Sequence, residues 1–277
     1  MGQTSFGAAC GGKALRLARL SRCGNGRSLV VPMDHSVTIG PMAAGRCPAS
    51  LSLMLADAGV DAIVVHKGRV RTIPPRAFAD LGLIVHLSAG TVHHRDRDAK
   101  VLVGDVEEAL SLGADAVSVH VNVGSVGELD QLADLGRVAG ECARLGVPLL
   151  AMMYARGEDV ASVADSPAML AHLGAIAVDL GADMVKLPFA GSVEAMRDVV
   201  ASCPIPVYVA GGTPRPTPAG DLELARAALA SGAAGLSFGR CVFEAEDPFA
   251  AAVALAALVH ETGTGRRDRS VVAAAST

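Results

Sequence analysis

The stretch Gly181-Ala-Asp-Met-Val-Lys-Leu-Pro188 decides the fold of this chain. A glycine ahead of a short apolar run is a common helix end, because glycine adopts the left-handed conformation of a C-terminal cap. The run from Ala182 to Leu187 has no amphipathic period, which is typical of a strand buried on both faces. It carries Lys186 near its end. Such a lysine either reaches solvent or a carboxylate, or is buried as a reactive amine.

The same unit of helix, glycine and apolar strand recurs along the chain, which predicts a parallel sheet. Eight strands in about 250 residues favour a single (β/α)8 TIM barrel with a parallel eight-stranded core. A doubly wound sheet is the alternative, but the turn after the first strand lacks the glycine-rich motif of that fold. Four strands are predicted at Leu29–Met33, Leu83–Leu87, Ala182–Leu187 and Pro206–Ala210. The other four lie within the glycine-led stretches Gly59–His66, Gly113–His120, Gly146–Met153 and Gly232–Gly239.

Helical patterns lie between most of these strands, and Lys13–Ser21 is predicted as a short helix on the bottom of the barrel. The segment Arg69–Asp80 is a weaker helix, because Pro74 and Pro75 lie within it. We expect one barrel domain over residues 1–262, loose in its first 11 residues, and a disordered tail over 263–277. The clear helices are Ala49–Ala58, Val106–Leu112, Val126–Leu145, Pro167–Leu180, Ser192–Ala201, Asp221–Ser231 and Pro248–Glu261.

Composition narrows the class of protein. The chain has 277 residues, is 51% hydrophobic and carries a net charge of −4, which argues against nucleic acid or an anionic membrane as a partner. Aromatic residues make up 3%, with no Trp, so stacking platforms for bases are poorly supported. Its 6 cysteines lack CxxC spacing, which predicts reduced thiols and a cytoplasmic protein.

The catalytic end of a TIM barrel is formed by the C-terminal ends of its strands, so the residues there are the candidate site. Almost every predicted strand ends in polar or glycine residues, which core packing alone does not explain. In strand order these residues are Asp34, His35 and Ser36; His66 and Lys67; His86 and Ser88; His120 and Asn122; Tyr154 and Arg156; Lys186; Gly211 and Gly212; and Gly239 and Arg240.

The glycines of the last two strands predict a phosphate site. Loops after strands seven and eight of such barrels commonly bind phosphate through backbone N–H groups. Gly211, Gly212 and Gly239 leave room for that approach, and Arg240 adds a cation. Ordinary tight turns are the alternative explanation of the same glycines.

Lys186 is then a candidate Schiff-base lysine for a phosphorylated carbonyl compound. Tyr154, one strand away, can move the substrate proton, and Asp34 can assist at the carbinolamine hydroxyl. Lys67 either lowers the pKa of Lys186 by charge repulsion or forms a salt bridge with Asp34. A rival hypothesis joins His66, His86 and His120 in a metal site, although these histidines can equally be hydrogen-bonded packing residues.

The motifs together resemble the archaeal-type class I (DhnA/DeoC-like) aldolase family over roughly residues 13–262. The matching segments are Val31-Pro-Met-Asp-His-Ser-Val-Thr-Ile-Gly-Pro41, Val65-His-Lys-Gly68, Leu83-Ile-Val-His-Leu-Ser-Ala89, Val117-Ser-Val-His-Val-Asn122, Pro148-Leu-Leu-Ala-Met-Met-Tyr154 and Gly181-Ala-Asp-Met-Val-Lys186. The Asp-His-Ser variant, the Thr91-Val-His93 loop and the tail composition bring it closest to the branch that makes 2-amino-4,5-dihydroxy-6-oxo-7-(phosphooxy)heptanoate.

That resemblance implies a metal-free Schiff-base aldolase, a lyase, that joins dihydroxyacetone phosphate to L-aspartate 4-semialdehyde. Its product would feed 3-amino-4-hydroxybenzoate, a precursor of secondary metabolites. By position, the Schiff-base lysine of the family is Lys186, its tyrosine is Tyr154 and its first-strand aspartate is Asp34. We place His35, Lys67, Gly211, Gly212, Gly239 and Arg240 around the substrate and its phosphate. The family also implies a homo-oligomer, such as a decamer.

Three departures from the family pattern concern substrate specificity. Leu187-Pro188-Phe189 replaces the usual Thr-x-Tyr, Tyr154-Ala-Arg-Gly157 replaces Tyr-Pro-Arg-Gly, and a Pro-rich element follows Gly212. The alternatives within the family are a 2-amino-3,7-dideoxy-D-threo-hept-6-ulosonate synthase, which is a transaldolase, and a class I fructose-bisphosphate aldolase. A non-catalytic barrel that binds a sugar phosphate is an alternative of another class.

Overall fold

Eight parallel strands close into a barrel in the computed structural model, which describes residues 11–42 and 47–260. Around the barrel they follow the order β1-β10-β9-β8-β7-β6-β3-β2, so each strand pairs with its neighbours along the chain. This order confirms the TIM barrel and excludes the doubly wound sheet, whose strand order reverses at one point. The barrel strands are β1 (Ser28–Pro32), β2 (Ala62–His66), β3 (Gly82–His86), β6 (Ala116–Val123), β7 (Leu149–Ala155), β8 (Met184–Leu187), β9 (Val207–Ala210) and β10 (Gly235–Ser237).

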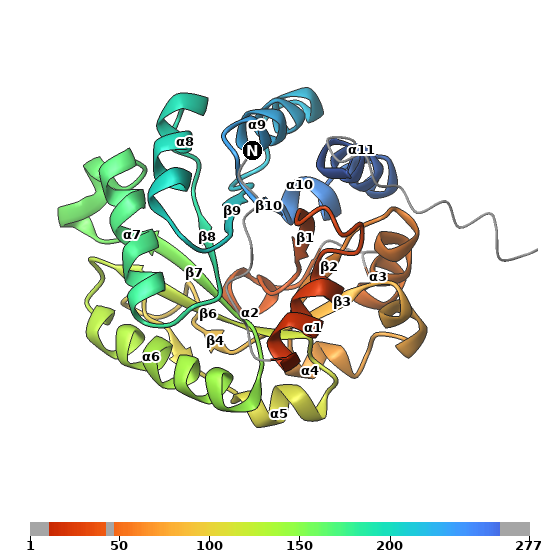
Figure 1. Cartoon of the computed structure of the whole chain (residues 1–277), viewed down its shortest axis with the longest axis horizontal. Helices are drawn as coiled ribbons and strands as arrows, with labels where there is room; N and C mark the ends of the chain where they lie inside the picture. The colour runs from red at the N-terminus through yellow and green to blue at the C-terminus, as the bar shows by residue number, and fades with distance from the viewer. Residues whose placement is uncertain (1–10, 43–46, 261–277) are drawn as a thin grey trace, which may run out of the picture.

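Helices surround the barrel (Figure 1), and most begin at a residue type that caps helices. The side chains of Asp105, Ser166, Ser192 and Thr217 each accept a backbone N–H from the first turn of the helix that follows. The predicted helices are confirmed with small shifts of their ends. They are α3 (Pro48–Asp57), α5 (Val106–Ser111), α6 (Glu128–Leu145), α7 (Pro167–Asp179), α8 (Val193–Ser202), α9 (Pro218–Ala230) and α11 (Pro248–His260).

The predicted helix over Arg69–Asp80 is not continuous. A short helix α4 (Lys67–Val70) is followed by a 3-10 helix η1 (Pro75–Ala79). Pro74 has the extended backbone, with ψ 131°, that a residue preceding a proline prefers. The double proline therefore breaks the segment into two pieces.

Four groups of short elements were not predicted, and all of them follow the C-terminal ends of barrel strands. They are α2 (Ser36–Ile39) after β1, the two-stranded sheet of β4 (Ser88–Ala89) and β5 (Val101–Leu102) after β3, the 3-10 helix η2 (Glu158–Val163) after β7, and α10 (Arg240–Phe243) after β10. Their position shows that the chain elaborates one end of the barrel, which is the end expected to carry the site.

The repeated Gly-x-Asp motif ties the opposite end of the barrel together. Asp61, Asp115 and Asp183 follow Gly59, Gly113 and Gly181, each of which has a positive φ. Each carboxylate accepts a backbone N–H from the strand that precedes it around the barrel. The donors are Leu29 at 2.7 Å, Leu83 at 3.0 Å and Leu149 at 2.9 Å, respectively. The three aspartates therefore help to fix the register between neighbouring strands.

Helix α1 (Gly11–Leu20) covers this end of the barrel, as predicted for Lys13–Ser21. Lys13 Nζ lies 2.7 Å from Asp183, and Arg19 lies 3.2 Å from Asp115. Leu17 and Leu20 pack into the interior of the barrel. The helix thus closes this end of the barrel with apolar side chains. Its basic side chains form ion pairs with aspartates that lie just before the barrel strands.

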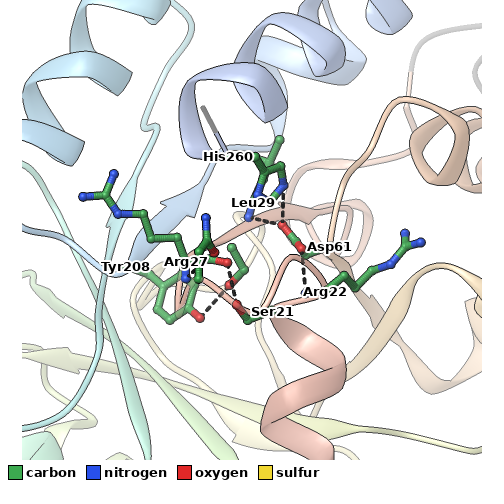
Figure 2. A network of polar contacts seen from close by, with 9 residues as sticks. Ser21, Arg22, Arg27, Leu29, Asp61, Tyr208 and His260 are labelled. Atoms are coloured by element: carbon green, nitrogen blue, oxygen red, sulfur yellow. Dashed lines mark hydrogen bonds and ion pairs between the residues drawn. The ribbon is translucent and has the colours of Figure 1, made fainter. Parts of the chain in front are cut away.

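A polar network joins the last helix to this end of the barrel (Figure 2). Asp61, whose side chain is 1% exposed, lies 3.2 Å from Nε2 of His260 on α11 and also accepts the backbone N–H of Arg22. Burial acts to lower the pKa of His260, but its hydrogen bond and charge interaction with Asp61 outweigh burial and raise it. Nearby, the hydroxyls of Ser28 and Tyr208 lie 2.7 Å apart inside the barrel.

Two apolar layers form the core. The larger one lies between the strands and the surrounding helices, and the smaller one fills the barrel itself. Successive residues of a strand face opposite sides, so every second residue belongs to the interior layer. The interior layer includes Val64, Ile84, Ala116, Leu150, Met152, Met184 and Tyr208.

Some expectations concern residues outside the described ranges. These are the tail over 263–277 and the loose segment predicted over residues 1–11, except for Gly11, which begins α1. Within the described residues, Cys23, Cys47, Cys142, Cys203 and Cys241 are free thiols. A search of those same residues finds no helix that is both long and apolar enough to cross a membrane.

Candidate active site

The polar side chains of the site follow the apolar interior residues of the barrel strands, two positions further toward the C-terminal end. His66 comes two residues after Val64, and Lys186 comes two residues after Met184, so each shares a face with the interior residue before it. The register between neighbouring strands places these polar residues at similar heights along the barrel axis. His66 pairs with His86, His86 with Ser118, Met152 with Lys186, and Asn122 with Tyr154. The barrel interior therefore changes from apolar to polar at its C-terminal end.

Lys186 on β8 is buried, with 8% exposure. Within the described part of the chain, its ammonium group makes no hydrogen bond and no ion pair within 4.0 Å. A buried lysine without a partner is unfavourable as a structural element, because burial penalises its charged form. The structure thus excludes the solvent-reaching alternative and leaves an amine available to a ligand.

Asp34, just after β1, is the acidic group that acts on Lys186. Burial acts to raise the pKa of Asp34, whereas its electrostatic interactions with His86, Lys186 and His66 lower it, and the balance lies below the ordinary value. Asp34 is therefore ionised at neutral pH. The charge of Lys186 thus acts on Asp34, the residue expected to assist at the carbinolamine hydroxyl.

Two neutral histidines lie on the other side of Asp34. His86 Nε2 is 3.7 Å from Asp34 Oδ2, and its Nδ1 lies 2.8 Å from the hydroxyl of Ser118. The ring of His66 is 5.2 Å away from that of His86. Burial lowers the pKa of His86 to about 4, despite the raising effect of Asp34, so this imidazole is uncharged at neutral pH.

Tyr154 at the end of β7 lies against two side chains. The ring of His120 stacks on it with centroids 4.9 Å apart, and the guanidinium carbon of Arg156 lies 5.3 Å from its centroid. His120 Nε2 is in turn 2.9 Å from the side-chain oxygen of Asn122. These contacts fix the phenol one strand away from Lys186, as predicted.

The rival metal site is not supported by these contacts. His86 and His120 each direct a ring nitrogen at a hydroxyl or amide, and no cluster of three potential metal ligands forms among residues 11–42 and 47–260. His86 beside Asp34 and His120 against Tyr154 are instead hydrogen-bonded imidazoles, and the ring of His66 lies next to that of His86.

The glycine loops after β9 and β10 lie together, since Arg240 Nη2 is 3.4 Å from the hydroxyl of Thr213. Gly212 has φ +71° and open space where a Cβ would be, so it retains the predicted room for a ligand. Gly239 serves close packing as well, because a Cβ there would lie 2.4 Å from the carbonyl oxygen of Pro32. Gly211 offers no free N–H, because that group already donates to Ser237. Of the three glycines predicted to bind phosphate through their backbone N–H groups, Gly212 and Gly239 therefore remain.

His35 borders the same loops. Its ring stacks on Phe243 of α10, with centroids 4.6 Å apart and planes 10° apart. Burial lowers the pKa of His35, although Asp34 and Glu244 act to raise it. Its Nδ1 is buried and has no hydrogen-bond partner in the described part of the chain. His35 therefore remains a candidate for contact with substrate.

The salt bridge weighed between Lys67 and Asp34 is wrong. The ammonium of Lys67 donates to Glu108 of α5 at 2.8 Å instead. Lys67 instead lines a separate hollow of about 370 Å³ beneath β5, together with Glu108 and Arg137 of α6. The reason is local: residue 67 begins α4, so its side chain leaves the interior face that His66 occupies.

Two groups that the sequence did not indicate belong to the site. Lys100, just before β5, acts with its charge on His66, His86 and His120. Ser237 at the end of β10 is 2% exposed, and its hydroxyl has no partner among the described residues. Lys100 lies in a polar loop that resembles any solvated segment, and Ser237 lies in a glycine-rich strand, so neither stands out in the sequence.

Similar proteins agree with this arrangement. Residues 28–245 match the DeoC/LacD family aldolase. A Streptomyces griseus protein named 2-amino-4,5-dihydroxy-6-oxo-7-(phosphonooxy)heptanoate synthase is 48% identical, covering 95% of this chain and 96% of that protein. An Archaeoglobus fulgidus 2-amino-3,7-dideoxy-D-threo-hept-6-ulosonate synthase is 39% identical, covering 90% and 91%.

A solved structure shares the fold of the whole barrel. It is an archaeal fructose-1,6-bisphosphate aldolase whose catalytic lysine is covalently bound to the carbinolamine intermediate of the substrate. Its TM-score to this chain is 0.81 at 28% sequence identity, covering 90% of this chain and 99% of that one. With the family match over most of the barrel, these findings confirm the resemblance, and the chain belongs to the DeoC/LacD family of aldolases.

Proposed function

We propose that this aldolase condenses dihydroxyacetone phosphate with L-aspartate 4-semialdehyde. The proposal follows from the product in the name of the Streptomyces griseus relative, which has a hydroxyl on C4, a hydroxyl on C5 and a ketone on C6. Cleaving the C4–C5 bond in the aldol sense gives dihydroxyacetone phosphate from C5 to C7. The remaining carbons, C1 to C4, are aspartate 4-semialdehyde.

The observation that carries the proposal is the buried and unpartnered amine of Lys186. Its nitrogen would attack the ketone carbon of dihydroxyacetone phosphate to form a carbinolamine, which loses water to give a protonated imine. The imine draws electrons from the neighbouring carbon, so that carbon releases a proton and becomes an enamine. The enamine carbon then forms the new bond to the aldehyde, and water regenerates the free lysine.

Asp34 and Tyr154 have the chemistry to move the protons of these steps. Asp34 is ionised and interacts electrostatically with Lys186, so it would accept the proton that the Lys186 nitrogen loses on attack and donate it to the carbinolamine hydroxyl, which leaves as water. Tyr154, held by His120 and Arg156, would take the proton from the donor carbon and deliver one to the new alkoxide. The neutral state of His86 suits this scheme, because an uncharged imidazole adds no positive charge beside Asp34.

The phosphate of the donor would lie at the loops after β9 and β10. Gly212, Gly239 and Arg240 remain the groups proposed there, with His35 at the edge. The unpartnered hydroxyl of Ser237 lies between these loops and the barrel interior, where a donor hydroxyl would satisfy it.

We further propose that the reaction needs no metal and takes place in the cytoplasm. Relatives that form a covalent bond between lysine and substrate support the first point. A homo-oligomer also remains a proposal, supported by apolar side chains such as Val126 and Leu129, which are 95% and 80% exposed at the start of α6.

The test is borohydride reduction in the presence of dihydroxyacetone phosphate, with and without EDTA, followed by intact and peptide mass spectrometry. We expect one adduct on Lys186 that survives EDTA, and none in Lys186→Met. Turnover with aspartate 4-semialdehyde then identifies the acceptor. An adduct that forms only with a deoxy-ketohexose phosphate would point to the transaldol reaction. A Lys186→Met protein with full biological function would indicate a non-catalytic barrel.

A further inference from the structure

The loop between β4 and β5 brings a second lysine to the site. Ser88 pairs with Leu102 and Ala89 pairs with Val101, so residues 90–100 form a connection above the ends of β3 and β6. At its end, Nζ of Lys100 lies beside Gly90, where a Cβ would come within 3.2 Å of it. The side chain of Lys100 therefore folds back along the loop instead of extending into solvent.

Both sides of this loop are anchored to barrel loops that carry the site. On one side, the backbone N–H of Val92 donates to Thr38 of α2, four residues after Asp34. On the other, the side-chain amide of Asn122 donates to the carbonyl of Asp98 at 2.7 Å. Ser88 also accepts the backbone N–H of His120. These bonds hold Lys100 at a fixed place over the histidine side of the site.

Lys100 is a cation without a partner. Within residues 11–42 and 47–260 its ammonium makes no hydrogen bond and no ion pair within 4.0 Å. Burial lowers its pKa, while Asp98, Asp34 and Asp96 act to raise it. All four lysines of the chain lie in the described part, and Lys13 and Lys67 have carboxylate partners. Lys100 and Lys186 are the two without one, and both act on the pKa of His120.

The two ends of the site thus carry different cations. Arg240 and the glycine loops follow β9 and β10, on one side of Lys186 around the barrel, whereas Lys100 lies over β3 and β6 on the other side. A donor whose phosphate lies at the glycine loops and whose ketone is on Lys186 leaves the far side to the acceptor. We propose that Lys100 binds the α-carboxylate of the acceptor aldehyde, an inference that rests on the proposed aldol reaction.

The surroundings of Lys100 favour a carboxylate over a phosphate. Asp96, Asp98 and Asp34 surround it electrostatically, so a phosphate dianion at the same place would meet repulsion from three acidic groups. An amino-acid aldehyde brings only a single negative charge, together with an ammonium group that the nearby aspartates attract. The charges around Lys100 therefore suit a zwitterionic acceptor better than a second phosphate group.

The test compares three acceptors in the wild type and in Lys100→Met, with dihydroxyacetone phosphate as donor. The acceptors are L-aspartate 4-semialdehyde, succinate semialdehyde, which keeps the carboxylate without the amine, and butanal, which has neither. Lysine-to-methionine exchange removes the charge at similar length. We expect KM for the two carboxylate acceptors to rise roughly 10- to 100-fold, the value of a lost charge-assisted hydrogen bond. The preference for these acceptors over butanal should fall by the same factor.

Two further variants serve as controls. Lys67→Met removes a lysine that lines the separate hollow with Glu108 and Arg137, and it should leave the preference for carboxylate acceptors intact. Lys100→Arg keeps the positive charge and should retain part of that preference. The borohydride adduct of dihydroxyacetone phosphate on Lys186 should form in Lys100→Met as in the wild type.

Two results in Lys100→Met would overturn the inference. One is loss of the borohydride adduct, and the other is a rise in KM for butanal equal to that for the carboxylate acceptors. Either would show that Lys100 contacts the donor or supports the fold of the site. A wild type that forms the adduct yet shows no preference for carboxylate acceptors would also overturn it, while leaving the imine chemistry in place. A wild type that forms no adduct with dihydroxyacetone phosphate would instead refute the proposed function.

Discussion

The imidazole of His120 lies against the phenol of Tyr154, with ring centroids 4.9 Å apart and planes at 25°. His120 lies on β6 and Tyr154 near the end of the adjacent strand β7, and the side-chain oxygen of Asn122 lies 2.9 Å from the imidazole. Burial lowers the pKa of His120 to about 3, so it is a neutral ring that positions Tyr154 rather than a proton donor. Its contribution to the reaction would therefore pass through the tyrosine.

Replacing His120 by leucine should lower kcat about 3- to 10-fold, because the phenol loses a stacking contact that holds it in place. Tyr154→Phe should lower kcat roughly 100-fold or more, because the proton transfer itself is lost. In the Tyr154→Phe background, His120→Leu should then have little further effect. Steady-state kinetics of the four proteins measure this, and losses that multiply independently would show that His120 acts on something other than Tyr154.

The buried histidines make the stability of the fold sensitive to mild acid. The pKa of His86 is about 4 in the folded protein, whereas an unfolded histidine titrates at about 6.5. Between these values the unfolded chain binds a proton that the folded chain does not, so the free energy of unfolding decreases as the pH falls through this window. Urea denaturation at several pH values should show a shallower decrease in His86→Gln. The same change at the exposed His94 is the control, and equal slopes for all three proteins would contradict the assignment.

The ion pair beneath β8 should contribute to stability without affecting chemistry. The side chains of Lys13 and Asp183 are only 12% and 20% exposed, so Lys13→Met leaves a partly buried carboxylate without its cation. We expect a loss of about 2 kcal/mol in the free energy of unfolding. Arg19, which is 73% exposed in its pair with Asp115, is the matched control and should cost roughly 0.5 kcal/mol or less when replaced by Met. Equal losses in the two variants would show that burial of the pair is irrelevant.

Replacing Ser237, whose hydroxyl has no partner among the described residues, can distinguish a structural role from a role in binding the donor. Because this group has no partner in the described part of the chain, Ser237→Ala should leave the free energy of unfolding unchanged or slightly higher. If the donor uses the hydroxyl, KM for dihydroxyacetone phosphate should rise about 10-fold. Ser118→Ala, which removes a partner of His86, should instead lose about 1 kcal/mol of stability. An unchanged KM in Ser237→Ala would exclude a donor contact.

Periodicity alone located the framework of the site. The glycine that ends a helix and the apolar run behind it predicted five of the eight barrel strands, and an apolar run alone predicted the other three, since both signals are local. The same logic placed Lys186, Asp34 and Tyr154, because the end of a parallel strand always lies at the catalytic end of a barrel. The order of the motifs also gave the aldolase resemblance, which the family match over residues 28–245 confirms.

Only the tertiary structure decided the partner of each charged group. Lys67 and Lys100 are alike in sequence, yet one turns outward to Glu108 and the other folds back over the site, because a helix starts at the first and a hairpin loop holds the second. Likewise, the aspartates of the Gly-x-Asp motifs meet Lys13 and Arg19 across the barrel. Such contacts join residues far apart in the chain, and their geometry depends on packing that no local pattern encodes.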